Sequence, residues 1–154
     1  MLTQQRLQEL LSYNTDTGLF TRLKTGKVTN YTDPKYNRVL ISINNYPYKA
    51  HRLAWLYMTG SWPTFEIDHK NGDSSDNRWC NLRDIPHWKN MENITKPRSH
   101  NSHKLLGVTK NHHRFMARIR VNKKYLYIGT YDTPELAHAA YIQAKRRLHE
   151  GCTI

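Results

Sequence analysis

The feature that most constrains the fold is a strict alternation of side chains between residues 114 and 121. The apolar positions are Phe115, Ala117, Ile119 and Val121. Three of the four positions between them are arginine: Arg114, Arg118 and Arg120. Because successive side chains of a strand point to opposite faces, this pattern predicts a strand with one face in a core and the other face cationic.

The flanking segments predict that this strand belongs to a small sheet. Asn122-Lys123 is typical of a turn, and the segment after it continues the alternation, with Tyr125 and Tyr127 outward. Residues 105–110 supply a third strand. Thr133 is a favourable N-cap, and Pro134 suits the first position of the helix that follows. Residues 105–151 are therefore expected to form a three-stranded antiparallel sheet with one packed helix.

Positive charge is concentrated around this predicted sheet. Residues 95–154 hold 12 Lys and Arg against 3 Asp and Glu, whereas residues 1–94 hold 12 against 9. An excess of this kind is typical of nucleic-acid binding, because each neutralised phosphate releases counterions. The alternatives are a solvated strand face or an anionic membrane surface, but no apolar run approaches the ~18 residues of a membrane span. The candidate DNA contacts are Arg114, Arg118, Arg120, Lys123, Tyr125 and Tyr127.

The first half of the chain predicts a separate small lobe. Thr3 is a candidate N-cap for a short helix that the Asn14 and Asp16-Thr17-Gly18 region would end. Val39, Ile41 and Ile43 alternate before an Asn44-Asn45 turn, which predicts a hairpin with residues 46–50. Residues 51–58 then predict a helix closed by Gly60.

The strongest functional pattern lies in the middle of the chain. Asp68-His69 is followed by Asn81 and Asn90, in a segment that predicts strand, polar loop, strand and a helix over residues 86–93. A neutral imidazole at His69 can take a proton near neutral pH, and an extended backbone turns Asp68 to the opposite side, as metal binding requires. Asn90 can add a carbonyl oxygen, while Asn81 is expected to brace either the loop or the histidine ring.

An oxygen-rich, half-filled ligand set of this kind suits Mg²⁺, with Mn²⁺ able to substitute. The only cysteines, Cys80 and Cys152, form no Cys-x-x-Cys pair, so a zinc-binding cysteine cluster is absent. A calcium loop at residues 71–73 lacks the alternating ligands and the final Glu of an EF-hand, and a tight turn accounts for it better. His87 and Asn93 remain alternative helix ligands, and His51 either lines the site or packs in the core.

The residues of this segment resemble the phage-type HNH endonucleases. His69, Asn81 and Asn90 fall on the three signature positions and Asp68 on the additional metal-binding acid, and residues 50–55 also resemble that group. Residues 107–148 resemble the APETALA-two/ethylene-responsive DNA-binding domain. The resemblance implies an α+β fold: a ββα-metal (His-Me finger) nuclease lobe in residues 1–94 with its core in 66–94, a basic linker in 95–104, and a DNA-binding domain in 105–151.

These observations predict a metal-dependent endonuclease that hydrolyses double-stranded DNA, and the resemblance implies a free-standing homing enzyme of phage origin. The alternative is a regulatory DNA-binding protein whose nuclease lobe is residual. The beginning of the chain lacks the pattern of a secretory signal, so a cytoplasmic location is expected, in the host cell if the chain is phage-encoded. Target sequence, one-strand or two-strand cutting, and monomer or homodimer all stay open.

Overall fold

The computed structural model describes residues 1–29, 31–94, 97, 101, 104–122, 124–149 and 152. These fall into two compact units, Met1–His87 and Trp88–Ile154. The division lies inside a short helix, whereas the sequence placed the end of the nuclease lobe at residue 94. Among the described residues no helix is long and apolar enough to cross a membrane.

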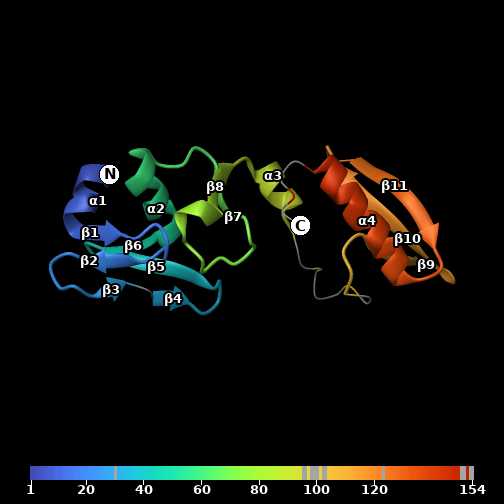
Figure 1. Cartoon of the computed structure of the whole chain (residues 1–154), viewed down its shortest axis with the longest axis horizontal. Coiled ribbons are helices and arrows are strands. Elements are labelled where there is room, and N and C mark those ends of the chain that lie inside the picture. The colour runs from blue at the N-terminus through green and yellow to red at the C-terminus, as the bar shows by residue number, and fades with distance from the viewer. Residues whose placement is uncertain are drawn as a thin grey trace. The chain divides into compact units, whose positions relative to one another are not determined.

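The first unit combines two helices with small antiparallel sheets (Figure 1). Its helices are α1 (Gln4–Leu10) and α2 (Ala50–Thr59), with a 3₁₀ turn at Trp79–Asn81. Its strands are β1 (Leu11–Tyr13), β2 (Phe20–Arg22), β3 (Val28–Thr29), β4 (Tyr31–Asp33), β5 (Arg38–Ile43), β6 (Tyr46–Lys49), β7 (Glu66–His69) and β8 (Leu82–Ile85). They form two three-stranded sheets, β1-β2-β3 and β4-β5-β6, and the hairpin β7-β8.

The predicted caps and turns of this unit are largely confirmed. The Thr3 side chain accepts a hydrogen bond from the Arg6 amide at the start of α1, and Gly60 ends α2 with φ of 79°. The hairpin turn Asn44-Asn45 has positive φ at both residues, the geometry that matches the twist of paired strands.

One expectation for the first helix was wrong. It ends at Leu10, and the next three residues form β1, which pairs with β2 across a turn at residues 14–19. The Asn14 side chain closes that turn by accepting from the amides of Asp16 and Thr17. Pairing with β2 and complete burial of Leu11 in the core outweigh the local preference for helix.

The core of the first unit joins the sheets, the helices and the β7-β8 hairpin. Six of its members are at most 1% exposed: Leu7, Leu11, Phe20, Ile41, Leu53 and Ala54. Leu82 of β8 belongs to the same cluster, and Ile67 and Trp79 pack against it. The hairpin that carries Asp68 and His69 is thereby held on a packed support.

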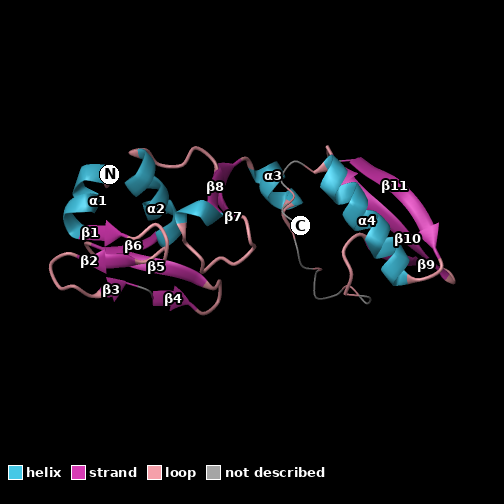
Figure 2. Cartoon of the chain, viewed as in Figure 1, coloured by secondary structure: helices cyan, strands magenta, loops and turns pink. Residues whose placement is uncertain are grey.

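The second unit is the expected three-stranded antiparallel sheet with one helix against it (Figure 2). Its strands, in the order β11-β10-β9, are β9 (Val108–Asn111), β10 (Arg114–Val121) and β11 (Lys124–Tyr131), and its long helix is α4 (Pro134–Leu148). Thr133 caps α4 as predicted. Val108, Ala117 and Ala137 form the buried cluster of this unit. Gly107 has φ of 73°, and a Cβ at this position would lie 1.9 Å from the Tyr141 ring, so a larger residue does not fit there.

Candidate active site

The register of the β7-β8 hairpin determines which side chains face each other. Asp68 is paired with Arg83 and His69 with Leu82, and neighbouring residues on each strand point to opposite faces. Both Asp68 and His69 are only 7% exposed. Two ionisable side chains are therefore held beside each other in the chain, on a short strand and largely away from water.

The carboxylate of Asp68 is compensated by Arg83. The Arg83 Nε and Nη2 atoms each lie 2.8 Å from Asp68 Oδ2. A carboxylate that is largely buried needs such charge-assisted bonds, because desolvation of an isolated ion costs several kcal/mol. Sequence reasoning did not single out Arg83. The contact between Arg83 and Asp68 follows from the pairing of the two strands, which the sequence alone does not specify.

His69 lies between a polar partner and an aromatic one. Its Nε2 is 3.3 Å from Asn77 Oδ1, and its ring meets the His51 ring edge-on with the centroids 5.2 Å apart. Burial lowers the pKa of His69, and the charge of Arg38 acts in the same direction. The bond to Asn77 and the charges of Asp68 and Asp73 oppose that shift without reversing it. The ring is therefore neutral at neutral pH.

His51 takes the buried position that one interpretation of the sequence favoured, and it also contacts the candidate base. It is 5% exposed, and its buried Nδ1 has no hydrogen-bond partner among the described residues. Burial lowers the pKa of His51 to about 3, with further lowering by His69 and by the nearby cations Arg38, Lys49 and Arg52. Two neutral imidazole rings thus lie in contact at this site.

Asn81 holds the loop between the two strands. Its Oδ1 accepts from the Asn71 amide at 3.0 Å, and its Nδ2 donates to Asn71 Oδ1 at 3.0 Å and to the Asp76 carbonyl at 2.8 Å. The sequence predicted that Asn81 braces either the loop or the histidine ring, and the contacts of its side chain are with the loop. The side chain beside the histidine ring is Asn77, which sequence reasoning missed because it lies outside the signature spacing.

The loop itself has the geometry of a tight turn. Gly72 has φ of 75°, and Asp73 Oδ1 accepts from both the amide and the hydroxyl of Ser75. These bonds lower the pKa of Asp73. The oxygen that a calcium loop would direct at an ion is here satisfied within the turn, as the tight-turn interpretation expects.

Asn77 is fixed by the first residues of the unit. The Tyr13 hydroxyl donates to the Asn77 carbonyl at 2.7 Å, and burial raises the pKa of that hydroxyl. Gly18 has φ of 73°, and a Cβ at this position would lie 2.4 Å from the Asn77 carbonyl carbon. The β1-β2 hairpin, which the sequence did not predict, therefore helps to position the partner of His69.

Of the expected helix ligands, His87 and Asn90 lie on α3 (His87–Glu92), which starts within a residue of the expectation, whereas Asn93 follows the end of the helix. Asn90 belongs to the second unit, whose position relative to Asp68 is not determined, so its role as a metal ligand stays a prediction (Figure 1). Asn93 is buried, and its amide donates to the Asn90 carbonyl. His87 is exposed, and its Nδ1 lies 2.9 Å from Glu66 Oε1.

The donor chemistry of these residues fits a magnesium ion. Among the described residues no three His, Cys, Asp or Glu side chains gather as a metal cage. Mg²⁺ does not need one, since it keeps several waters and is usually held by one or two carboxylates together with substrate phosphate. Asp68 is a carboxylate of the kind that such a site uses, and an asparagine carbonyl would be a compatible second ligand.

The second unit presents the predicted cationic strand face. Arg118 and Arg120 are exposed, and their guanidinium carbons lie 4.9 and 5.9 Å from the Tyr125 ring centroid. Tyr127 is exposed as well, and its hydroxyl shares a 2.8 Å hydrogen bond with Thr130. The Tyr125 ring thus forms cation–π contacts with two arginine side chains on the outer face of the sheet.

Arg114 and Lys123 differ from the other candidates on this face. Arg114 bonds Asp132 at 2.8 Å and the Thr130 carbonyl at 3.2 Å, so its charge is already partnered. Lys123 lies outside the described residues. Within the β10-β11 pair, the centre of the cationic face is therefore formed by Arg118 and Arg120, with the Tyr125 ring against both of them.

The central segment of the chain matches a known protein family. Residues 48–92 match the model of a family described as HNH endonuclease. The matched segment includes His51, Asp68, His69, Asn81 and Asn90, and the match confirms the HNH resemblance there. The resemblance of residues 107–148 to the APETALA-two domain stays a prediction.

Among solved structures, the chain is similar to one described as "DNA binding and cleavage by the HNH homing endonuclease I-HmuI". The two share 21% identity, with 92% of this chain and 88% of that chain covered and a TM-score of 0.46. No curated protein matches the chain.

Proposed function

We propose that the chain is a metal-dependent endonuclease that hydrolyses phosphodiester bonds in double-stranded DNA. The observation that carries the proposal is the adjacent pair on β7: a buried, neutral imidazole at His69 and a buried carboxylate at Asp68, within the segment that matches HNH endonucleases. A homing role and a phage origin are further parts of the proposal, taken from the sequence resemblance.

In the proposed mechanism His69 is the general base. When its Nε2 carries the proton and donates to Asn77 Oδ1, the lone pair is on Nδ1, which can then take a proton from the attacking water. Asn77 thereby selects the tautomer, and His51 restricts the ring from its edge. Asn81 acts indirectly, by keeping the loop that carries Asn77 in one conformation.

Asp68 and Asn90 are the proposed ligands of Mg²⁺, with Mn²⁺ able to substitute. When bound, the ion would stabilise negative charge on the phosphorane and on the leaving 3′ oxygen. Cleavage would leave a 3′-hydroxyl and a 5′-phosphate. The Arg83 guanidinium on Asp68 Oδ2 orients the carboxylate for this role.

The direct test is incubation of supercoiled plasmid with the full-length protein and Mg²⁺. Cleavage should appear with Mg²⁺ or Mn²⁺ and disappear with EDTA. A purely regulatory protein, the second candidate, would retard the plasmid without cutting it. End-labelling each strand of a cleaved duplex would then show whether one strand or both are cut.

The acid limb of the pH profile is expected below pH 6.5, the ordinary pKa of histidine, because burial lowers the pKa of His69. The base works only when neutral, so kcat/KM should stay level as pH falls toward 6.5 and decline only below it. The measurement is kcat/KM for a short duplex across pH 5 to 8 at saturating Mg²⁺. A decline centred above pH 6.5 would contradict a neutral, buried base.

The second unit is proposed to hold the DNA through its cationic face. Arg118→Ala should weaken binding and reduce the slope of log K against log salt by about 0.9, the value for one lost phosphate contact on duplex DNA. The matched control is Arg146→Ala, an exposed arginine on α4. If both variants have the same affinity and slope, the β10-β11 face is not the DNA-binding surface.

A further inference from the structure

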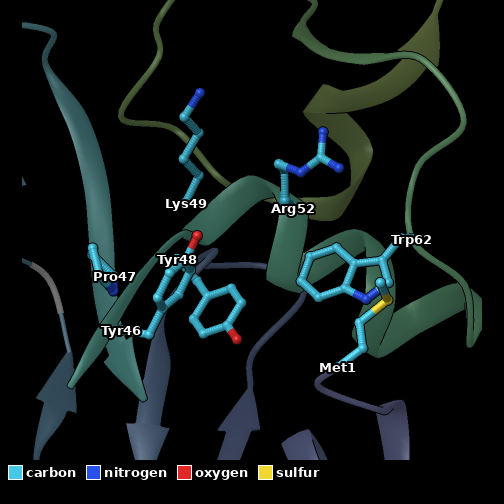
Figure 3. A pocket seen from close by; sticks show the side chains of 7 residues that line it. All are labelled: Met1, Tyr46, Pro47, Tyr48, Lys49, Arg52 and Trp62. Carbon is cyan, nitrogen blue, oxygen red and sulfur yellow. The ribbon is translucent and has the colours of Figure 1, made fainter. Parts of the chain in front are cut away.

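An open pocket of about 540 Å³ lies on the first unit, outside the residues discussed as catalytic (Figure 3). Its volume is within the range of roughly 300–1,000 Å³ that small-molecule sites occupy. It is lined mainly by β6, the first turn of α2 and one tryptophan: Tyr46, Pro47, Tyr48, Lys49, Arg52 and Trp62.

Three aromatic rings in this pocket are arranged as a surface for stacking. The Tyr46 and Tyr48 centroids are 4.9 Å apart in an edge-on contact, and Tyr48 stacks with Trp62 at 5.9 Å. The Trp62 Nε1 donates to the Leu2 carbonyl, which fixes the indole ring. Tyr46 nevertheless remains 62% exposed. Rings held rigidly at a surface lose little conformational entropy when a flat ligand stacks on them.

The polar part of the lining is cationic. Figure 3 shows Lys49 and Arg52 extending away from the tyrosine rings, and the lining contains no acidic side chain. Neither cation forms an ion pair among the described residues, and the Arg52 guanidinium lies 5.7 Å from the Trp62 ring centroid. The first turn of α2 contains no acidic residue either. These charges fit an anionic group and disfavour an apolar peptide, which would bury them unpaired.

The pocket is also close enough to the candidate active site to influence it. Lys49 and Arg52 flank His51 in sequence, and the charge of each contributes to lowering the pKa of His51. His51 in turn contacts the His69 ring. The pocket and the candidate base are therefore linked within the first unit through His51.

We propose that this pocket binds one unpaired nucleotide of the DNA strand being cut, with its base on the Tyr46-Tyr48-Trp62 rings and its phosphate on Lys49 and Arg52. Aromatic rings beside cations are the usual means of holding single-stranded nucleic acid, since every base has a stacking face. A base inside a duplex cannot stack on a side chain, so binding requires local unpairing. The inference rests on the proposed nuclease function and names a substrate subsite within it.

The test uses the full-length protein in EDTA, where cleavage cannot interfere, and a fluorescein-labelled oligothymidylate followed by anisotropy. Tyr46→Ala should weaken binding about tenfold, the effect expected for one lost base stack. The control Tyr31→Ala removes a ring of similar exposure, 65%, from β4 and should bind like the wild type. Lys49→Gln should lower the salt slope by about 0.7, whereas Lys24→Gln, on the β2-β3 turn, should not.

An abasic oligonucleotide of the same length separates stacking from backbone contact. The Tyr46→Ala effect should vanish on this ligand, while the Lys49→Gln effect should remain. The proposal is overturned if Tyr46→Ala binds oligothymidylate like the wild type, or if it loses as much affinity for the abasic strand. Because the assay excludes cleavage, a protein that never cuts plasmid can still pass it, and failure of the nuclease proposal remains distinguishable.

Discussion

His69→Ala is expected to lower the rate constant for plasmid cleavage by about 10²- to 10⁴-fold, the usual contribution of a general base. The ring has Asn77 beside one nitrogen and is in T-shaped contact with the His51 ring, and the variant removes the group proposed to accept the proton from water. DNA affinity should be unchanged, because His69 belongs neither to the proposed cationic face of the second unit nor to the lining of the proposed nucleotide pocket. The measurement is single-turnover cleavage at saturating Mg²⁺, with DNA binding measured in EDTA.

The matched control is His87→Ala. His87 is exposed and pairs with Glu66, and it should be dispensable for cleavage if Asn90 is the helix ligand. A large loss of rate in His87→Ala would place that imidazole at the metal. Cleavage by His69→Ala at the wild-type rate would refute the assignment of the base, while leaving the protein a nuclease that uses another group.

Much of the fold was predictable because local signals and packing agree. Thr3 and Thr133 cap their helices, and the alternation over residues 114–121 gives a strand with Ala117 and Ile119 buried. The β1 strand was not predictable, since nothing local in residues 11–13 opposes continuation of the helix. Its pairing with β2 supplies the reason, and that information lies in the tertiary structure.

In the candidate site, too, some residues could be identified from the sequence and others only from tertiary contacts. Asp68, His69 and Asn81 were identified because their spacing is a motif, but their partners depend on contacts across the hairpin and its loop. Asn77 lies beside the His69 ring, and its carbonyl accepts a hydrogen bond from Tyr13, which is 64 residues away in the sequence. Arg83 meets Asp68 only because the hairpin pairs these two residues. Motif spacing thus identifies the candidate reacting groups, whereas the strand register and the anchoring of the loop identify the residues that contact them.

Arg83→Ala is expected to destabilise the first unit by about 3 kcal/mol, the low end of the cost of breaking a buried ion pair. The variant leaves the Asp68 carboxylate, whose side chain is 8% exposed, without the guanidinium that bonds its Oδ2 twice. The low end applies because Arg83 itself retains 22% exposure and admits some water. Urea unfolding followed by tryptophan fluorescence suits this unit, which contains Trp55, Trp62 and Trp79.

Arg78→Ala is the matched control for that measurement. Arg78 also bonds an aspartate with two guanidinium nitrogens, at 2.8 and 2.6 Å from the Asp76 oxygens, but its side chain is 49% exposed, so its loss should cost much less than the loss of Arg83. The double variant Asp68→Asn with Arg83→Ala should recover part of the lost stability, because a neutral amide of the same shape replaces the unpaired charge. Equal losses for Arg83→Ala and Arg78→Ala would mean that solvent, and not Arg83, compensates Asp68. The carboxylate would then have no fixed orientation in which to receive a metal ion.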